Sequence, residues 1–110
     1  MKIIDNKELI KTLKRYRNKG IYIHHLGTIS GTNTIHKMTF VYYNNIIVIN
    51  DKISKNYFAI NLSYVYKMLT NRDRTTVKLY LDDDVVITIV KCGLERSGNS
   101  KEKNKNCYII

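Results

Sequence analysis

The chain has 110 residues, of which 19 are Lys or Arg and 9 are Asp or Glu, so its formal net charge is +10. This length predicts one domain, and a hydrophobic share of 44% is enough for one modest core, which excludes a disordered chain. No apolar run approaches the roughly 20 residues that a membrane-spanning helix needs. The positive field around so small a protein favours partners with negative charge, such as phosphate backbones, acidic proteins or acidic lipids.

Part of this charge has a source other than function. Ile, Asn, Lys and Tyr make up almost half of the chain, and their codons are rich in A and T. Such a composition is typical of AT-rich genomes, among them those of phages, mobile elements and large DNA viruses. The same bias also permits Glu, yet Glu occurs only at Glu8, Glu95 and Glu102. We therefore expect a functional surplus of positive charge above the codon background.

The first predicted element is an amphipathic helix over residues 5–19. Asp5 is placed to cap it, and Glu8 three residues later completes a capping-box pattern. Gly20 follows as a residue that can take the left-handed conformation at a helix end. The apolar residues recur at helical spacing and predict one buried stripe, which consists of Leu9, Ile10, Leu13 and Tyr16.

From Ile21 onwards the apolar period changes to two, which predicts strands of an antiparallel sheet. The predicted strands cover residues 21–26, 37–43, 46–50, 57–61, 76–81 and 85–91. Asn44-Asn45 and Asp82–Asp84 predict hairpin turns, because Asn and Asp suit turn conformations. A short helix is expected at 63–69, with Ser63 as its cap.

These elements predict an α+β fold. The N-terminal amphipathic helix and the short second helix are expected to pack on one face of a curved antiparallel sheet of five or six strands. Residues 1–92 form the predicted single compact domain. Residues 93–110 are predicted to be a flexible basic tail, and residues 27–36, rich in Gly, Thr and Ser, to be a mobile, wing-like loop.

The candidate binding residues are cations with few acids near them. Lysines and arginines on an exposed helix face can lie along a phosphate backbone and release counterions. The loop after residue 70 adds two arginines beside hydroxyl and amide groups, and exposed tyrosines on a basic sheet can stack on unpaired bases. The predicted nucleic-acid-binding residues are Lys7, Lys11, Lys14, Arg15, Arg17, Lys19, Arg72, Arg74, Tyr43 and Tyr80.

No catalytic residue, metal site or cofactor is predicted. His24 and His25 are adjacent on a predicted strand and point to opposite faces, and Cys92 and Cys107 lack metal-ligand spacing. A ribonuclease that uses a histidine, such as His25 or His36, together with Lys37 or Arg74 remains an alternative. The last four residues, Cys-Tyr-Ile-Ile, fit a prenylation pattern whose modification is left open.

The sequence thus predicts a small, non-enzymatic protein that binds DNA or RNA through backbone phosphates, as an accessory or regulatory protein of a virus, phage or mobile element. The main alternative is an interaction or inhibitor protein that binds an acidic protein surface, because Tyr and Arg are frequent interface anchors. A homodimer is also left open. A cytoplasmic, reducing location is expected, because the N-terminus turns polar at Asp5 and lacks a signal-peptide core.

Overall fold

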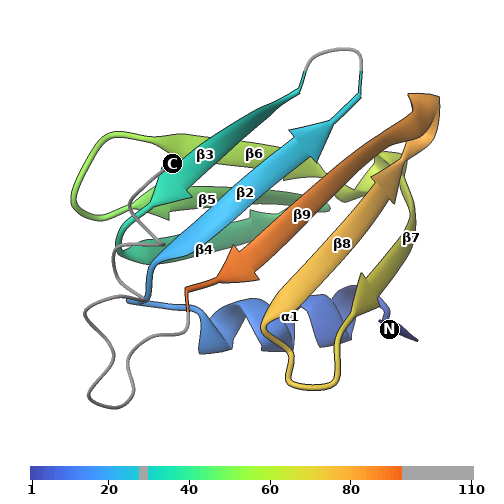
Figure 1. The fold of residues 1–110 in the computed structure, drawn as a ribbon, viewed down its shortest axis with the longest axis horizontal. Helices are drawn as coiled ribbons and strands as arrows, with labels where there is room; N and C mark the ends of the chain where they lie inside the picture. Colours follow the sequence, from blue (N-terminus) through green and yellow to red (C-terminus); the bar gives the residue numbers. More distant parts are fainter. Residues whose placement is uncertain (28–29, 93–110) are drawn as a thin grey trace.

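The computed structural model describes residues 1–27 and 30–92, which build one helix and nine strands in two antiparallel sheets (Figure 1). The larger sheet has six strands in the order β1 (Lys2–Ile3), β7 (Val65–Thr70), β8 (Thr76–Leu81), β9 (Val85–Lys91), β2 (Ile21–Leu26) and β3 (Gly31–Ile35). The smaller sheet has the order β4 (Met38–Tyr43), β5 (Ile46–Asp51) and β6 (Tyr57–Asn61). The helix is α1 (Asn6–Arg15), and two 3-10 turns are η1 (Leu62–Tyr64) and η2 (Asp82–Asp84).

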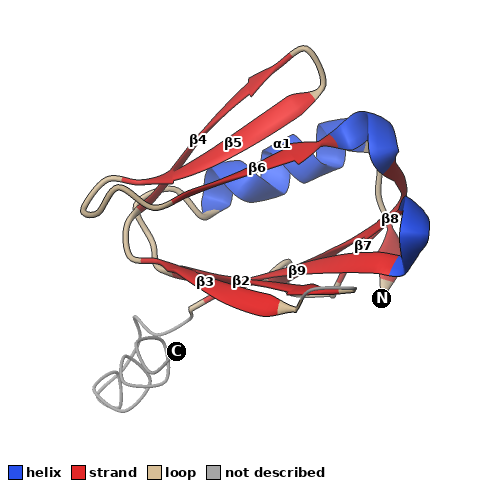
Figure 2. Cartoon of the chain, turned by 90° about the horizontal axis from the view of Figure 1, so that it is seen from above, coloured by secondary structure: helices blue, strands red, loops and turns tan. Residues whose placement is uncertain are grey.

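The two sheets face each other across the core, and α1 runs along one open side between them (Figure 2). Alternate residues of each strand point inward, so Val77 and Leu79 of β8 are buried, as are Ile47 and Ile49 of β5. The helix adds Leu9, Leu13 and Tyr16 to the same buried cluster. The fold is therefore α+β, but the expected single sheet of five or six strands is instead a curled six-stranded sheet with a small three-stranded sheet facing it.

The helix α1 is shorter than the expected 5–19 segment. The side chain of Asp5 caps it by accepting a hydrogen bond from the backbone N–H of Glu8 at 2.9 Å. It ends at Arg15, and the left-handed residue beyond it is Asn18, with φ 65°, rather than the expected Gly20. The reason is tertiary: the Asn18 N–H donates to the carbonyl of Met38, and this bond draws the chain towards β4.

The second helix expected at 63–69 is absent and was a wrong prediction. This segment forms η1, capped by Asn61 rather than Ser63, and then strand β7. A register shift between Val65 and Lys67 inserts one extra residue into the pairing with β8. The bulge spaces apolar residues three or four apart, and this imitates a helical period.

Residues 27–36 were expected to be a loop, but five of these ten residues form β3. The strand is rich in Gly, Thr and Asn, which offer no apolar alternation, and its pairing with β2 overrides that weak propensity. Gly31 faces His25, and a side-chain carbon at position 31 would lie 3.1 Å from the His25 ring. The His25 ring in turn stacks on Phe58 of the opposite sheet, with 5.9 Å between ring centroids.

A buried carboxylate orders the corner between β3, β4 and β5. Asp51 accepts hydrogen bonds from the backbone N–H groups of His36, Lys37 and Ile53 at 2.9, 3.0 and 3.0 Å, and from the Ser54 hydroxyl at 3.0 Å. Burial by itself would raise the pKa of Asp51. The hydrogen bonds outweigh it and hold the pKa well below the ordinary value, so the carboxylate stays charged.

Candidate nucleic-acid interface

Three lysines form an exposed ridge on α1. Lys7, Lys11 and Lys14 are exposed on the side of the helix that lies opposite the buried Leu9 and Leu13. Positions i, i+4 and i+7 of a helix share one face, and their rise of 1.5 Å per residue spreads the three ammonium groups over about 10 Å. We call these three residues the lysine ridge. Its spacing suits several successive phosphates rather than one small anion.

The turn between β7 and β8 packs against the same helix, and Arg74 holds it there. The Arg74 guanidinium lies 2.8 Å from a carboxylate oxygen of Glu8 and donates to the Thr12 hydroxyl at 3.2 Å. The buried Tyr16 hydroxyl donates to the Arg74 carbonyl at 2.8 Å. The two predicted basic groups, on the helix and in this turn, therefore lie on one side of the molecule.

A basic hollow of about 330 Å³ lies where α1 meets this turn, lined by Lys11, Thr12, Arg15 and Arg74. A smaller hollow of about 230 Å³ continues past Arg15 towards the turn and Lys91, and its lining also includes the acidic Asp73. Lys91 was not predicted as a site residue. Lys91 of β9 pairs with Ile21 of β2, which follows closely after the helix. This pairing brings Lys91 to the hollow.

Arg74 differs from the other cations because its charge is used inside the protein. The hydrogen bond and the positive charge of Arg74 lower the pKa of the Glu8 carboxyl. The backbone of Arg74 also has φ 57°, a left-handed conformation within a turn that Asn71 organises by accepting from the N–H groups of Thr75 and Thr76. These contacts assign Arg74 a structural role at the candidate interface, while Arg72 is exposed.

Replacing Arg74 by alanine should therefore lower stability more than it lowers any affinity for nucleic acid. We expect a loss of about 1 to 2 kcal/mol in the free energy of unfolding, because a half-buried ion pair and the bond to Thr12 are both removed. Urea unfolding would measure it. Arg72→Ala is the matched control and should stay within about 0.5 kcal/mol of the parent protein. Equal stability of the two variants would contradict this assignment.

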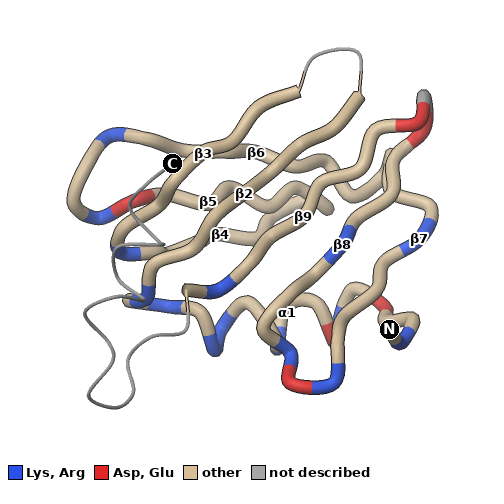
Figure 3. The backbone as a smooth tube through the Cα atoms, in the orientation of Figure 1, with Lys and Arg blue, Asp and Glu red and all other residues tan. Residues whose placement is uncertain are grey.

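Charge is distributed unequally along the molecule (Figure 3). Basic residues follow α1 and flank the one acidic residue of the β7–β8 turn, Asp73, whereas the acidic turn η2 lies at the other end of strand β8. A six-residue strand separates these ends by about 17 to 20 Å.

No protein-family model, curated protein or solved structure matches the chain. Over residues 1–27 and 30–92, the one helix is too short and too polar to cross a membrane.

The remaining predicted cations lie near the end of α1. The Arg17 guanidinium is 4.8 Å from the ring centroid of Phe40, and Lys19 is exposed. The β2–β3 end of the larger sheet, where the expected 27–36 loop begins, lies away from the helix (Figure 1). The lysines at 101, 103 and 105 of the predicted basic tail fall outside the described residues.

The two predicted stacking tyrosines do not form one platform. Tyr80 lies on the outer face of the larger sheet with Thr76 and Lys78, and the ammonium group of Lys67 is 4.6 Å from its ring centroid. Tyr43 lies on the outer face of the smaller sheet and is 73% exposed. Since the two inner faces meet in the core, these outer faces point away from each other, and neither tyrosine shares a surface with the lysine ridge.

The histidines occupy separate places. The Nδ1 atom of His24 lies 2.9 Å from the Thr32 hydroxyl on the outer face, while His25 points inward. The Nδ1 atom of His36 lies 3.2 Å from Asp51. In the part of the chain that the structure describes, no three His, Cys, Asp or Glu side chains cluster so that they could hold a metal ion.

Proposed function

We propose that this protein binds nucleic acid through the phosphate backbone, with the lysine ridge and Arg15 as its central contacts. Arg17, Lys19 and Arg72 would extend the contact surface beyond them. The observation that supports this best is the gathering of cations from α1 and the β7–β8 turn on one side, far from the acidic turn η2. Phosphate neutralisation by Lys and Arg is the chemistry that such a surface performs.

The proposal concerns binding rather than catalysis. The two acids nearest to the ridge are already engaged, because Asp5 caps α1 and Glu8 pairs with Arg74. Among the described residues no lysine of the ridge forms an ion pair, so all three ammonium groups are open to an external partner. This arrangement favours contacts that are independent of base sequence, since phosphates carry no direct sequence information.

Binding should weaken steeply as salt increases. We expect about three to five phosphate contacts, so the affinity for a fluorescein-labelled 20-nucleotide strand should fall roughly 20- to 130-fold between 50 and 200 mM salt, and the affinity for the corresponding duplex roughly 40- to 500-fold. Fluorescence anisotropy with the single strand and the corresponding duplex would measure the slope for each. The physical reason is the release of one condensed counterion for about every phosphate neutralised.

Two results would count against the proposal. One is the absence of binding to either probe at 50 mM salt. The other is an affinity that does not change with salt, because a salt-independent complex cannot depend on phosphate neutralisation. A weakly basic protein of similar size is a suitable control for nonspecific loss of the probe.

A further inference from the structure

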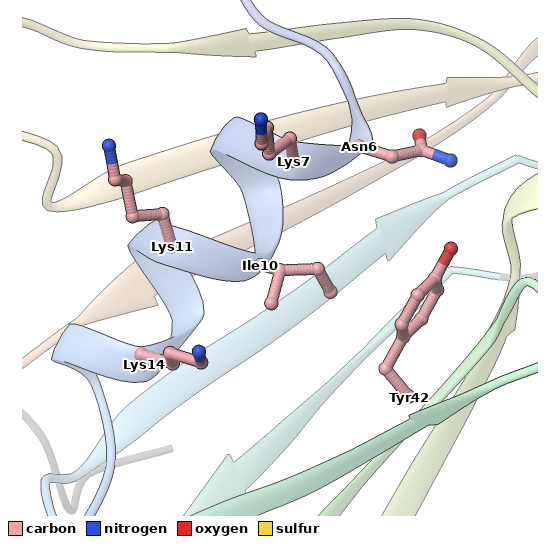
Figure 4. A pocket seen from close by; sticks show the side chains of 6 residues that line it. All are labelled: Asn6, Lys7, Ile10, Lys11, Lys14 and Tyr42. Carbon is pink, nitrogen blue, oxygen red and sulfur yellow. The ribbon is translucent and has the colours of Figure 1, made fainter.

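A second feature of α1 faces away from the β7–β8 turn. A groove of about 580 Å³ lies between the helix and strand β4, and its lining consists of Asn6, Lys7, Ile10, Lys11 and Lys14 from α1 and Tyr42 from β4. In Figure 4, Ile10 and the ring of Tyr42 lie on opposite sides of the groove, and the lysines extend from the helix. The groove thus has apolar walls beside a cationic rim.

Strand β4 is an edge strand, and part of its backbone is unpaired. The backbone N–H of Met38 donates to the carbonyl of Lys19, and the carbonyl of Met38 accepts from the N–H of Asn18. Both backbone groups of residue 38 therefore point away from β5. Pairing alternates along an antiparallel strand, and therefore Phe40 and Tyr42 also direct their N–H and C=O groups to the open edge. No hydrogen bond to these backbone groups is found among the described residues.

The charge beside this edge is of one sign. None of the lining residues is acidic, and within residues 1–27 and 30–92 no lysine of the ridge takes part in an ion pair. An occupant with negative charge is therefore complementary to the rim. The walls add a second condition: Ile10 and the Tyr42 ring suit an apolar side chain, whereas a nucleobase would bury polar edges that they cannot satisfy.

We propose that this groove binds an extended acidic peptide segment of a partner protein. The peptide adds a strand to the edge of β4, and its backbone bonds to Phe40 and Tyr42. One apolar side chain of the peptide packs between Ile10 and Tyr42, and its acidic side chains reach the lysine ridge. The open part of β4 spans five residues, 39–43, which at about 3.4 Å per residue matches a short peptide.

A designed heptapeptide tests this directly. The probe is fluorescein-labelled Glu-Val-Glu-Leu-Glu-Val-Glu, titrated with the full chain and followed by anisotropy. Three changes to the peptide isolate the three contributions: serine in place of the apolar residues, lysine in place of the glutamates, and N-methyl groups on the apolar residues. Each change should weaken binding at least about 10-fold, because each removes packing, charge or backbone pairing.

Variants of the protein locate the site. Tyr42→Ala should weaken binding of the peptide about 10-fold or more and change the affinity for the 20-nucleotide strand less than about 3-fold. Tyr57→Ala is the matched control, since Tyr57 is an exposed tyrosine on β6 of the same sheet. It should leave both affinities unchanged.

Three outcomes would overturn the inference: no binding of the heptapeptide, equal binding of the N-methylated form, or full binding by Tyr42→Ala. If the heptapeptide fails while the 20-nucleotide strand binds, the groove proposal falls and the nucleic-acid proposal stands. If the peptide alone binds, the reverse holds. An absence of peptide binding would also assign the lysines a different role, as charges that keep the β4 edge from pairing with other strands.

Discussion

Replacing Lys11, Lys14 and Arg15 together by glutamate should weaken binding of nucleic acid by about 100-fold or more at 100 mM salt. The triple change removes three cations from the exposed face of α1 and adds three carboxylates beside the phosphates. The slope of log affinity against log salt should also become shallower by about three, since each lost phosphate contact contributes about 0.9. Anisotropy titrations at several salt concentrations would measure both values.

A matched control gives the protein the same net charge as the α1 triple variant. Lys55, Lys67 and Lys78 replaced by glutamate change the net charge equally, but these residues lie on the β5–β6 loop and on β7 and β8. This control should lose less than about 10-fold in affinity, because long-range attraction falls while the contacts remain. Equal losses in the two triple variants would show that total charge, rather than the α1 surface, determines binding.

Folding must be tested separately for the α1 variant. Acidic residues in the last turn of a helix oppose the helix dipole, and the two introduced there, at Lys14 and Arg15, together cost about 1 kcal/mol. The corresponding glutamine variant avoids this cost, so it should retain the parental Tm and still lose several-fold in affinity. Normal binding by a folded glutamine variant would move the contact surface away from α1.

Replacing Asp51 by alanine should cost about 3 to 5 kcal/mol in the free energy of unfolding. The change leaves the backbone N–H groups of His36, Lys37 and Ile53 without their acceptor at a buried corner. Buried donors without a partner cost about 1 to 3 kcal/mol each. A drop in Tm of roughly 15 °C or more is expected, and calorimetry or urea unfolding would measure it.

Asp51 also makes stability depend on pH in a defined direction. The pKa of its carboxyl is held below that of the unfolded chain, so its contribution is fully present above the ordinary aspartate value of about 4. The contribution is lost as the pH falls through the lower folded value. Asp51→Asn should be about half as destabilising as Asp51→Ala, and its stability should fall less steeply in acid.

The control for this residue is an exposed aspartate. Asp82→Ala, in the η2 turn, should change stability by no more than about 0.5 kcal/mol. If Asp51→Ala unfolds at the parental temperature, the corner is held by other contacts. The hydrogen bonds assigned to Asp51 would then contribute little net stability.

Several strands could be predicted because they are short runs rich in β-branched and aromatic residues, and one of them, 76–81, alternates clearly. The strands at 21–26, 57–61, 76–81 and 85–91 have the expected boundaries, and Asn44 and Asn45 take the positive φ values that their turn requires. Each of these patterns reflects a local property of the chain. Two segments were predicted wrongly. In β3, pairing with β2 overrides a weak strand propensity, and in β7 a bulge hides the two-residue period.

The candidate site divides in the same way. The surplus of cations and their helical spacing at Lys7, Lys11 and Lys14 follow from the sequence, because periodicity along one helix is a local property. The groove at Tyr42 could not be predicted from the sequence, since β4 lies more than twenty residues after α1 and only the tertiary structure brings the two together. The same holds for Asp51, whose hydrogen bonds join the β3–β4 link to the β5–β6 loop.

By itself, then, the sequence determined that this is a strongly basic α+β chain whose first helix carries few acids. Only the tertiary structure decided that the β7–β8 turn lies against that helix, because the meeting requires strands β7 and β8 to pair and to pack beside α1. It also decided that Arg74 pairs with Glu8, whereas no lysine of the ridge forms an ion pair within the described residues. The physical reason is that net charge is a sum over the residues of the chain, whereas strand pairs and ion pairs depend on which residues the fold brings into contact.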